Sequence, residues 1–298
     1  MRGVVVALGN FDGVHLGHQE VLGRAVEEGL RRGMRVVAAT FHPHPRAVLG
    51  AGDPPKLLTP MTLRREELLR HGADEVVEIP FDLELSKKSP EQFVRDVLVG
   101  DLGAGVVVIG ENFRYGHRAA GDVGDLHRLM REMGGEAVAV EVRGVGEGAG
   151  ISSTRIRALV SEGKVDEAAS LLGRRYVLRG EVVVGDRRGR TIGFPTANVL
   201  PDAEAVLPAR GVYTGFVMVG DDEYVACTNV GVAPTFARAE SRIEAYLLDF
   251  DGDLYGRVID VGFTRKIRGE KKFSGVAELK AQIQRDVEEA RLISDGQP

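Results

Sequence analysis

The sequence contains a single cysteine, Cys227, among its 298 residues. One cysteine excludes an intramolecular disulfide framework and any metal site built from several cysteines, and it fits the reducing cytoplasm. Long apolar runs are also missing, so no segment approaches the roughly 20 residues that a membrane-spanning helix needs. The apolar stretch at residues 4–8 is too short for the core of a signal peptide. We therefore expect a cytoplasmic protein with no membrane partner.

An excess of positive charge is missing as well, because 39 Lys and Arg face 44 Asp and Glu, for a formal net charge of −5. This balance provides no global field for a nucleic-acid backbone, although local phosphate sites remain open. Internal repeats and low-complexity tracts are absent, and 43% hydrophobic residues are typical of a globular chain. We expect no nucleic-acid partner.

The length of the chain exceeds the usual size of one domain, and the hydrophobic pattern changes period near Arg175. Before this point, strands alternate with helices, which predicts an α/β domain with a parallel sheet. Thr59 is expected to cap one of these helices, residues 60–71. The strands are expected at residues 4–8, 35–41, 75–81, 106–109 and 137–142.

Beyond Arg175, short strands are separated by turns without helices between them. Such a pattern predicts a small antiparallel β-barrel, with a helix over residues 274–293 packed across it. The strands are expected at residues 176–184, 211–219, 224–230, 243–250 and 257–263.

Residues 9–18 read Gly-Asn-Phe-Asp-Gly-Val-His-Leu-Gly-His and follow the first strand directly. If a helix begins near His15, His18 lies one turn later, and both imidazoles face one side of the helix N-terminus. The unpaired N–H groups and partial positive charge there favour a phosphate. Two histidines without a nucleophile suit nucleotidyl transfer, which needs charge stabilisation and no covalent intermediate. A glycine-rich turn with incidental histidines is the alternative.

Two further stretches of the first half carry polar groups. Residues 151–157 read Ile-Ser-Ser-Thr-Arg-Ile-Arg, in which hydroxyls at a helix start and an arginine one turn later form a second anion cradle. A purely structural cap is the alternative. Residues 110–116, Gly-Glu-Asn-Phe-Arg-Tyr-Gly, follow a strand of the predicted parallel sheet, and ligands bind at such strand ends.

The barrel half carries its own motif at residues 185–198, Gly-Asp-Arg-Arg-Gly-Arg-Thr-Ile-Gly-Phe-Pro-Thr-Ala-Asn. Glycines around basic residues suit a loop that covers phosphates, although a simple hairpin is the alternative. Thr196 and Asn198 lie on one side of an extended chain, and their neutral oxygens suit Mg²⁺. Glu244 stands inside an apolar strand, where an acidic residue usually faces solvent.

Together these motifs resemble those of the prokaryotic bifunctional riboflavin kinase and FAD synthetase family, and the resemblance spans residues 4–291. It implies an α/β chain with a Rossmann-like nucleotidyltransferase domain, the FMN adenylyltransferase, at residues 1–173. It implies a riboflavin kinase barrel at residues 174–298. Riboflavin, FMN and ATP would be the substrates, FMN and FAD the products, and Mg²⁺ the cofactor.

The resemblance also implies roles for individual residues. His15 and His18 would stabilise the phosphate during adenylyl transfer, and Glu244 would accept the proton of the riboflavin 5′-hydroxyl. In the adenylyltransferase, the ATP site would comprise Gly9, Phe11, Gly17, Ser152, Ser153, Thr154 and Arg157, and the flavin site Asn112. In the kinase, the ATP site would comprise Gly185, Gly193, Pro195, Thr196 and Asn198, with Thr196 and Asn198 also holding the metal and Arg268 binding the flavin. Residues 229–236 resemble a neighbouring flavin-side loop.

Two other functions remain open at this point. A different His-x-Gly-His nucleotidyltransferase, such as a pantetheine-phosphate or cytidylyl enzyme, would account for the first half but does not predict the Gly-Phe-Pro-Thr-Ala-Asn motif of the barrel. A flavin-binding protein that has lost catalysis is the second. The presence of both histidines, Arg157 and Glu244 argues against that second reading.

Overall fold

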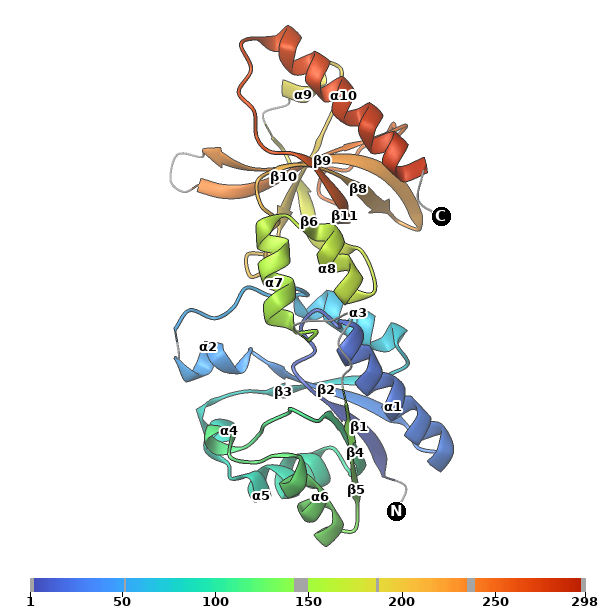
Figure 1. Ribbon diagram of the computed structural model, residues 1–298, viewed down its shortest axis with the longest axis vertical. Coiled ribbons are helices and arrows are strands. Elements are labelled where there is room, and N and C mark those ends of the chain that lie inside the picture. The colour runs from blue at the N-terminus through green and yellow to red at the C-terminus, as the bar shows by residue number, and fades with distance from the viewer. Residues whose placement is uncertain (1–2, 51, 142–149, 186–187, 235–238, 296–298) are drawn as a thin grey trace. The chain divides into compact units, whose positions relative to one another are not determined.

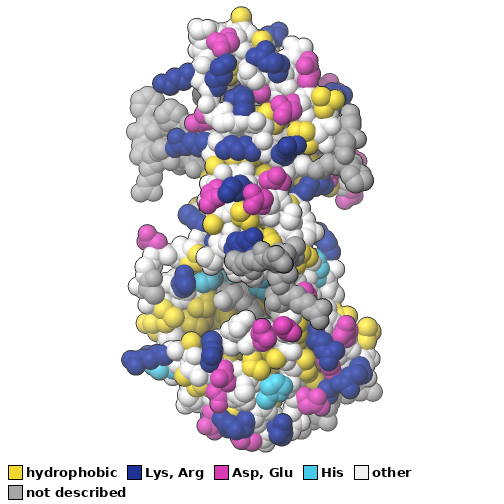
Figure 2. All heavy atoms as spheres, in the orientation of Figure 1, with side chains coloured by type: hydrophobic (Ala, Val, Ile, Leu, Met, Phe, Trp, Pro, Cys, Tyr) yellow, Lys and Arg dark blue, Asp and Glu magenta, His cyan; other side chains and the backbone are white. Residues whose placement is uncertain are grey.

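The computed structural model describes residues 3–50, 52–141, 150–185, 188–234 and 239–295. The chain divides into two compact units, Met1–Ser153 and Thr154–Pro298, each with its own sheet (Figure 1). In the described parts of the chain, no helix is both long and apolar enough to cross a membrane. On the face drawn in Figure 2, side chains of both charges are interspersed over the two units.

The first unit is built on a five-stranded sheet in the order β3-β2-β1-β4-β5, and every pair is parallel. This confirms the parallel sheet predicted from the alternation of strands and helices. Its strands are β1 (Val4–Leu8), β2 (Val36–His42), β3 (Glu75–Pro80), β4 (Ala104–Gly110) and β5 (Glu136–Val140).

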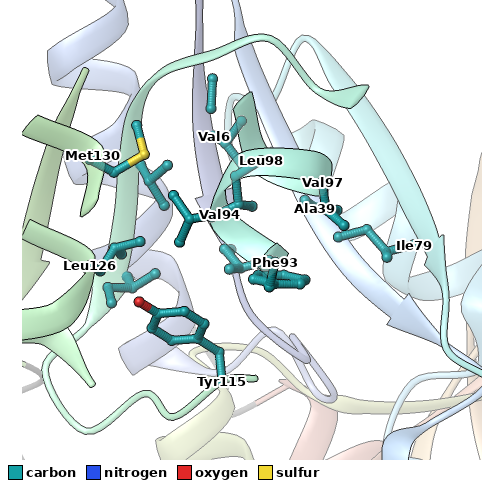
Figure 3. Packing of buried hydrophobic residues seen from close by; sticks show 14 of the residues in the cluster. Val6, Ala39, Ile79, Phe93, Val94, Val97, Leu98, Tyr115, Leu126 and Met130 are labelled. Atoms are coloured by element: carbon teal, nitrogen blue, oxygen red, sulfur yellow. The ribbon is translucent and has the colours of Figure 1, made fainter. Parts of the chain in front are cut away.

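Helices cover both faces of this sheet, so its central strand β1 is apolar at every position. Val5 and Ala7 belong to the core shared with α1 (Leu16–Arg32) and α3 (Met61–Arg70). Val6 and Leu8 belong to the opposite core, drawn in Figure 3, where the π-helical segment η1 (Phe93–Asp101) and α6 (Val123–Glu132) supply the partners. The short helices of this unit are α2 (Pro45–Leu49), α4 (Leu83–Lys87), α5 (Pro90–Gln92) and η2 (His117–Ala119).

Two helix ends test the sequence predictions. His15 is the N-cap of α1, as the motif predicted. The prediction that Thr59 caps α3 is wrong, because Pro60 occupies the N-cap without a side-chain hydrogen bond. The Thr59 hydroxyl instead accepts a hydrogen bond from the Gly13 N–H at 2.9 Å. The loop before α3 is therefore bound to the turn after β1.

The second unit is a closed barrel in the order β10-β7-β6-β11-β8-β9, which confirms the predicted antiparallel barrel. Strand β7 was not predicted, because its residues were assigned to the motif that includes Asn198. The helix α10 (Val276–Asp295) packs on β8 and β9, and α8 (Val165–Leu172) packs on β6 and β11. The strands are β6 (Tyr176–Val183), β7 (Ala197–Pro201), β8 (Gly211–Val219), β9 (Asp222–Pro234), β10 (Ala239–Leu247) and β11 (Val258–Arg268); the remaining helices are α7 (Ser153–Glu162) and α9 (Arg188–Thr191).

The barrel leaves no room for a side chain at Gly262, where β11 pairs with β8. Gly262 lies opposite Phe216, and a Cβ atom on Gly262 would lie 1.9 Å from the Phe216 ring. We therefore expect Gly262→Ala to lower the free energy of unfolding by about 1–3 kcal/mol or more, as overpacking does. Gly269→Ala is the matched control, because a Cβ atom there meets nothing within 4 Å. Urea denaturation of the two variants checks this, and equal midpoints would contradict the packing described.

Candidate active sites

The chain leaves β1 at Leu8 and reaches α1 through a tight buried turn. Gly9 packs closely at its start, because a Cβ atom there would lie 3.2 Å from the Phe11 ring, which would have to shift slightly. Phe11 has φ of 49° and Val14 has φ of 39°, a left-handed conformation that residues with side chains rarely adopt. Both side chains are almost fully buried. Packing therefore holds this turn in a conformation that it would not adopt alone.

His15 and His18 meet at the end of this turn. The Nδ1 atom of His15 accepts a hydrogen bond from the His18 N–H at 3.3 Å, so neutral His15 carries its proton on Nε2. The two rings stack with centroids 3.6 Å apart and planes 15° apart. The edge-to-face contact of Phe11 with His18, at 5.2 Å between centroids, holds the second ring. Both imidazoles thus lie on one side of the helix start, as predicted.

The environment of His18 keeps its imidazole neutral. Burial lowers the pKa of His18 well below its ordinary value, and the nearby charges of His15 and Arg64 lower this pKa further. The His18 Nδ1 atom is buried and has no hydrogen-bond partner among the described residues. A neutral imidazole at a helix N-terminus offers an N–H donor to a phosphate without carrying a charge of its own.

A buried carboxylate, Asp12, anchors the turn from behind. Asp12 accepts hydrogen bonds from the Leu58 and Thr59 N–H groups at 3.0 and 3.1 Å. It also forms an ion pair with Arg64 of α3 at 3.2 Å. Sequence reasoning assigned no role to Asp12 and missed Arg64, because Arg64 lies 52 residues away in an ordinary amphipathic helix. Only the fold brings the two together.

The second anion motif of this half begins at the same turn. The Ser153 hydroxyl donates a hydrogen bond to the Asp12 carbonyl at 2.8 Å, so Ser153, the last residue of the first unit, contacts the histidine turn. Thr154 and Arg157 follow on α7 and belong to the second compact unit. Gly17 is buried in the first turn of α1. Asn112 is exposed just beyond β4, which is the parallel neighbour of β1.

The barrel brings Glu244 beside two asparagines. Glu244 on β10 lies opposite Asn198 of β7 and opposite Asn229 of β9. Directly opposed residues project to the same face of a sheet, so the three side chains share one face. Ile243 and Ala245 are fully buried on the other face. Glu244 therefore faces away from the barrel interior, but into a cavity rather than open solvent.

Two cavities meet on this face of the barrel. The larger, about 710 Å³, is lined by Glu244, Arg268 and residues of α10. The smaller, about 380 Å³, is lined by Pro195 and residues 250–255. The residues that line both are Gly189, Thr196 and Asn198. A ligand in one cavity can therefore contact a ligand in the other beside Thr196 and Asn198.

Asn198 has the features of a cation ligand. Its Oδ1 atom is buried and has no hydrogen-bond partner among the described residues. Gly185 must be glycine here, because a Cβ atom there would lie 2.4 Å from the Asn198 side chain. No three His, Cys, Asp or Glu side chains of the described ranges gather as metal ligands would. A metal bound by Thr196 and Asn198 would take its other ligands from phosphate or water, as Mg²⁺ commonly does.

The flavin residue predicted in the barrel, Arg268, is fixed by an ion pair. Its guanidinium binds both oxygens of Asp286 on α10, with distances of 3.0 and 2.7 Å. Gln282 donates to the same carboxylate at 2.9 Å, and Asp286 is 3% exposed. Cys227 lines the larger cavity beside Arg268. Burial raises the pKa of its thiol to about 12, so the thiol remains protonated. Sequence reasoning missed Asp286, which carries no motif.

Parts of the predicted sites fall outside the described residues. They are Asp186 and Arg187 of the glycine-rich motif and Thr235 and Phe236 of the flavin-side loop. Gly193 is described, and its φ of 90° requires glycine at this turn.

Comparisons with known proteins match both halves of the chain. A family model described as FAD synthetase matches residues 1–155, and one described as riboflavin kinase matches residues 172–294. The proteins named bifunctional riboflavin kinase/FMN adenylyltransferase of Bacillus subtilis and Escherichia coli are each 38% identical to this chain over 291 residues. These matches cover 96% and 97% of this chain and 91% and 92% of the relatives.

A solved structure has the same fold along the whole chain. It is a Streptococcus pneumoniae protein described as a macrolide-efflux protein, with a TM-score of 0.89 and 33% sequence identity. The match covers 97% of this chain and 94% of that one. Two family models and nearly full-length relatives thus show the family: the chain belongs to the bifunctional riboflavin kinase/FMN adenylyltransferases.

Proposed function

We propose that residues 1–173 form the FMN adenylyltransferase domain and residues 174–298 the riboflavin kinase domain. The observation that supports the kinase assignment most strongly is the junction of two cavities at Thr196 and Asn198, beside Glu244. A phosphoryl transfer between two substrates needs such a junction, with a base on the acceptor side. Because ATP is abundant in the cytoplasm, we place both reactions there.

In the kinase, riboflavin occupies the larger cavity and ATP the smaller one. The Glu244 carboxylate accepts the proton of the 5′-hydroxyl while that oxygen attacks the γ-phosphorus. The bond from the γ-phosphorus to the bridging oxygen breaks, which yields FMN and ADP. Arg268, held by Asp286, contacts the flavin.

Thr196 and Asn198 hold Mg²⁺ in this proposal. The buried, unpartnered Oδ1 of Asn198 supports it, because a buried oxygen without a donor is stabilised by a cation. Bound there, Mg²⁺ supplies positive charge that offsets the phosphate charge as the γ-phosphoryl group transfers. Gly185 leaves room for the Asn198 side chain, Gly193 provides the positive φ of the turn before Phe194, and Pro195 forms part of the ATP cavity.

In the adenylyltransferase, the ATP triphosphate lies at the start of α1. A phosphate oxygen of FMN attacks the α-phosphorus, the bond to the bridging oxygen breaks, and pyrophosphate leaves. No hydroxyl must be deprotonated, so the enzyme needs donors rather than a base. His15 and His18 supply these donors. Gly9, Phe11 and Gly17 shape the turn; Ser152, Ser153, Thr154 and Arg157 bind the triphosphate, and Asn112 contacts the flavin.

Replacing Glu244 by glutamine tests the base. Glutamine has nearly the same shape but accepts no proton, so we expect the rate of riboflavin phosphorylation to fall by roughly 10²- to 10⁴-fold. The same variant, supplied with FMN, should make FAD at the normal rate, because the histidine site has its own core. Chromatography of the products measures both reactions. Normal phosphorylation by Glu244→Gln would remove the base assignment.

Replacing either histidine tests the other site. His15→Ala and His18→Ala should each lower the rate of FAD formation from FMN by about 10²-fold or more, since each removes a donor to the phosphate. Riboflavin phosphorylation should remain intact. His127→Ala, on α6 of the same unit, is the control and should form FAD normally. Two fully active single variants would disprove the role of the pair.

The metal ligands are tested by the Mg²⁺ requirement. Asn198→Ala removes the unpartnered Oδ1 atom, so we expect the Mg²⁺ concentration for half-maximal phosphorylation to rise by at least about 10-fold. The Mg²⁺ dependence of adenylylation, measured on the same preparation, should not change. An unaltered Mg²⁺ requirement of the kinase would show that Asn198 does not bind the metal.

A further inference from the structure

A buried arginine, Arg64, donates hydrogen bonds to the histidine turn and to the loop before α3. Arg64 on α3 is 2% exposed. One terminal nitrogen donates to the Asn10 carbonyl at 3.1 Å. The other donates to the Asp12 carboxylate at 3.2 Å and to the Thr59 carbonyl at 3.0 Å. A single guanidinium thus joins the turn after β1 to the loop before α3.

This turn needs such support. Phe11 and Val14 adopt left-handed backbone conformations, and for a β-branched residue such as Val14 this is a true outlier. The neighbouring carbonyl of Asn10 accepts two hydrogen bonds, from Thr40 at 2.9 Å and from Arg64. A strained turn persists only where several surrounding contacts hold it in place. Arg64 adds an ionic contact, with Asp12, to these supports.

We propose that Arg64 is a positioning residue for adenylyl transfer, which fixes the turn from which His15 and His18 meet ATP. The inference rests on the proposed role of the two histidines. Arg64 acts through the turn and not on the substrate. A small displacement of such donors costs rate because they must meet the charge that develops on the transferring phosphate.

Arg64 also contributes positive charge near His18. In the described residues, the groups that bear on His18 are stacked His15 and Arg64 of α3, and the charge of Arg64 is partly opposed by Asp12. Burial lowers the pKa of His18 most, His15 lowers it further, and the positive charge of Arg64 adds a smaller effect of the same sign. Removing that charge raises this pKa. In a plot of kcat/KM for adenylylation against pH, the decline on the acid side should then move to higher pH.

The test uses three variants of the full chain. Arg64→Met removes the guanidinium, Arg64→Lys keeps the charge but not the planar fork, and Arg65→Met is the control. Arg65 is the next residue of α3, and its side chain is 51% exposed. FAD formation from FMN is measured as kcat and as KM for ATP, and kcat/KM is followed against pH. Riboflavin phosphorylation on each preparation reports the integrity of the second unit.

We expect Arg64→Met to lower kcat of adenylylation by about 10- to 100-fold, with KM for ATP little changed and the acid limb moved to higher pH. Arg64→Lys should lose part of kcat and keep the wild-type acid limb. Arg65→Met should match the wild type.

A normal kcat in Arg64→Met, or a loss confined to KM for ATP, would overturn the inference. If Arg64→Met does not fold, Arg64→Lys decides, because wild-type kcat in this variant would overturn it equally. His15→Ala and His18→Ala, assayed in parallel, separate the two claims. Active histidine variants would remove the proposed site itself, whereas inactive histidine variants beside a normal Arg64→Met would remove only the role of Arg64.

Discussion

A polar atom that is buried away from water must find a partner, and this requirement organises both halves of the chain. Asp12 satisfies it inside the protein, through two backbone N–H groups and Arg64. Asp286 does so in the barrel, through Arg268 and Gln282. The Nδ1 atom of His18 and the Oδ1 atom of Asn198 remain buried without a partner in the described residues. The satisfied groups fix the frame, and these two unpartnered atoms lie where substrates are proposed to bind.

The two halves hold their reactive groups in different ways. In the first, a strand buried on both faces ends in a strained turn, and a helix N-terminus follows at once. In the second, strand register places Glu244 beside Asn198, and residues of α10 line the cavity that both side chains share. A turn can be displaced when one anchor is lost, whereas register is shared along the whole of a strand pair. The adenylyltransferase site should therefore depend more on distant anchors than the kinase site does.

The sequence predicted most of this arrangement because its signals are local. The period of the apolar residues predicted the parallel sheet and the barrel, and the position of His15 before an amphipathic run predicted a helix start. Arg64 and Asp286 could not be found in this way. Each acts through a partner far along the chain, and each sits in a helix where a charged residue would otherwise simply face solvent. The prediction for Thr59 was wrong for a related reason, because its hydroxyl accepts a hydrogen bond from Gly13, far along the chain, instead of capping the helix that follows it.

One chain carries two separate reactions in series. The most direct measurement is a chromatographic time course with riboflavin, ATP and Mg²⁺ that follows flavins, ADP and pyrophosphate together. We expect FMN to appear before FAD, and each FAD formed to be accompanied by one ADP and one pyrophosphate. Formation of FAD without ADP, or accumulation of FMN that the same chain never converts, would contradict it.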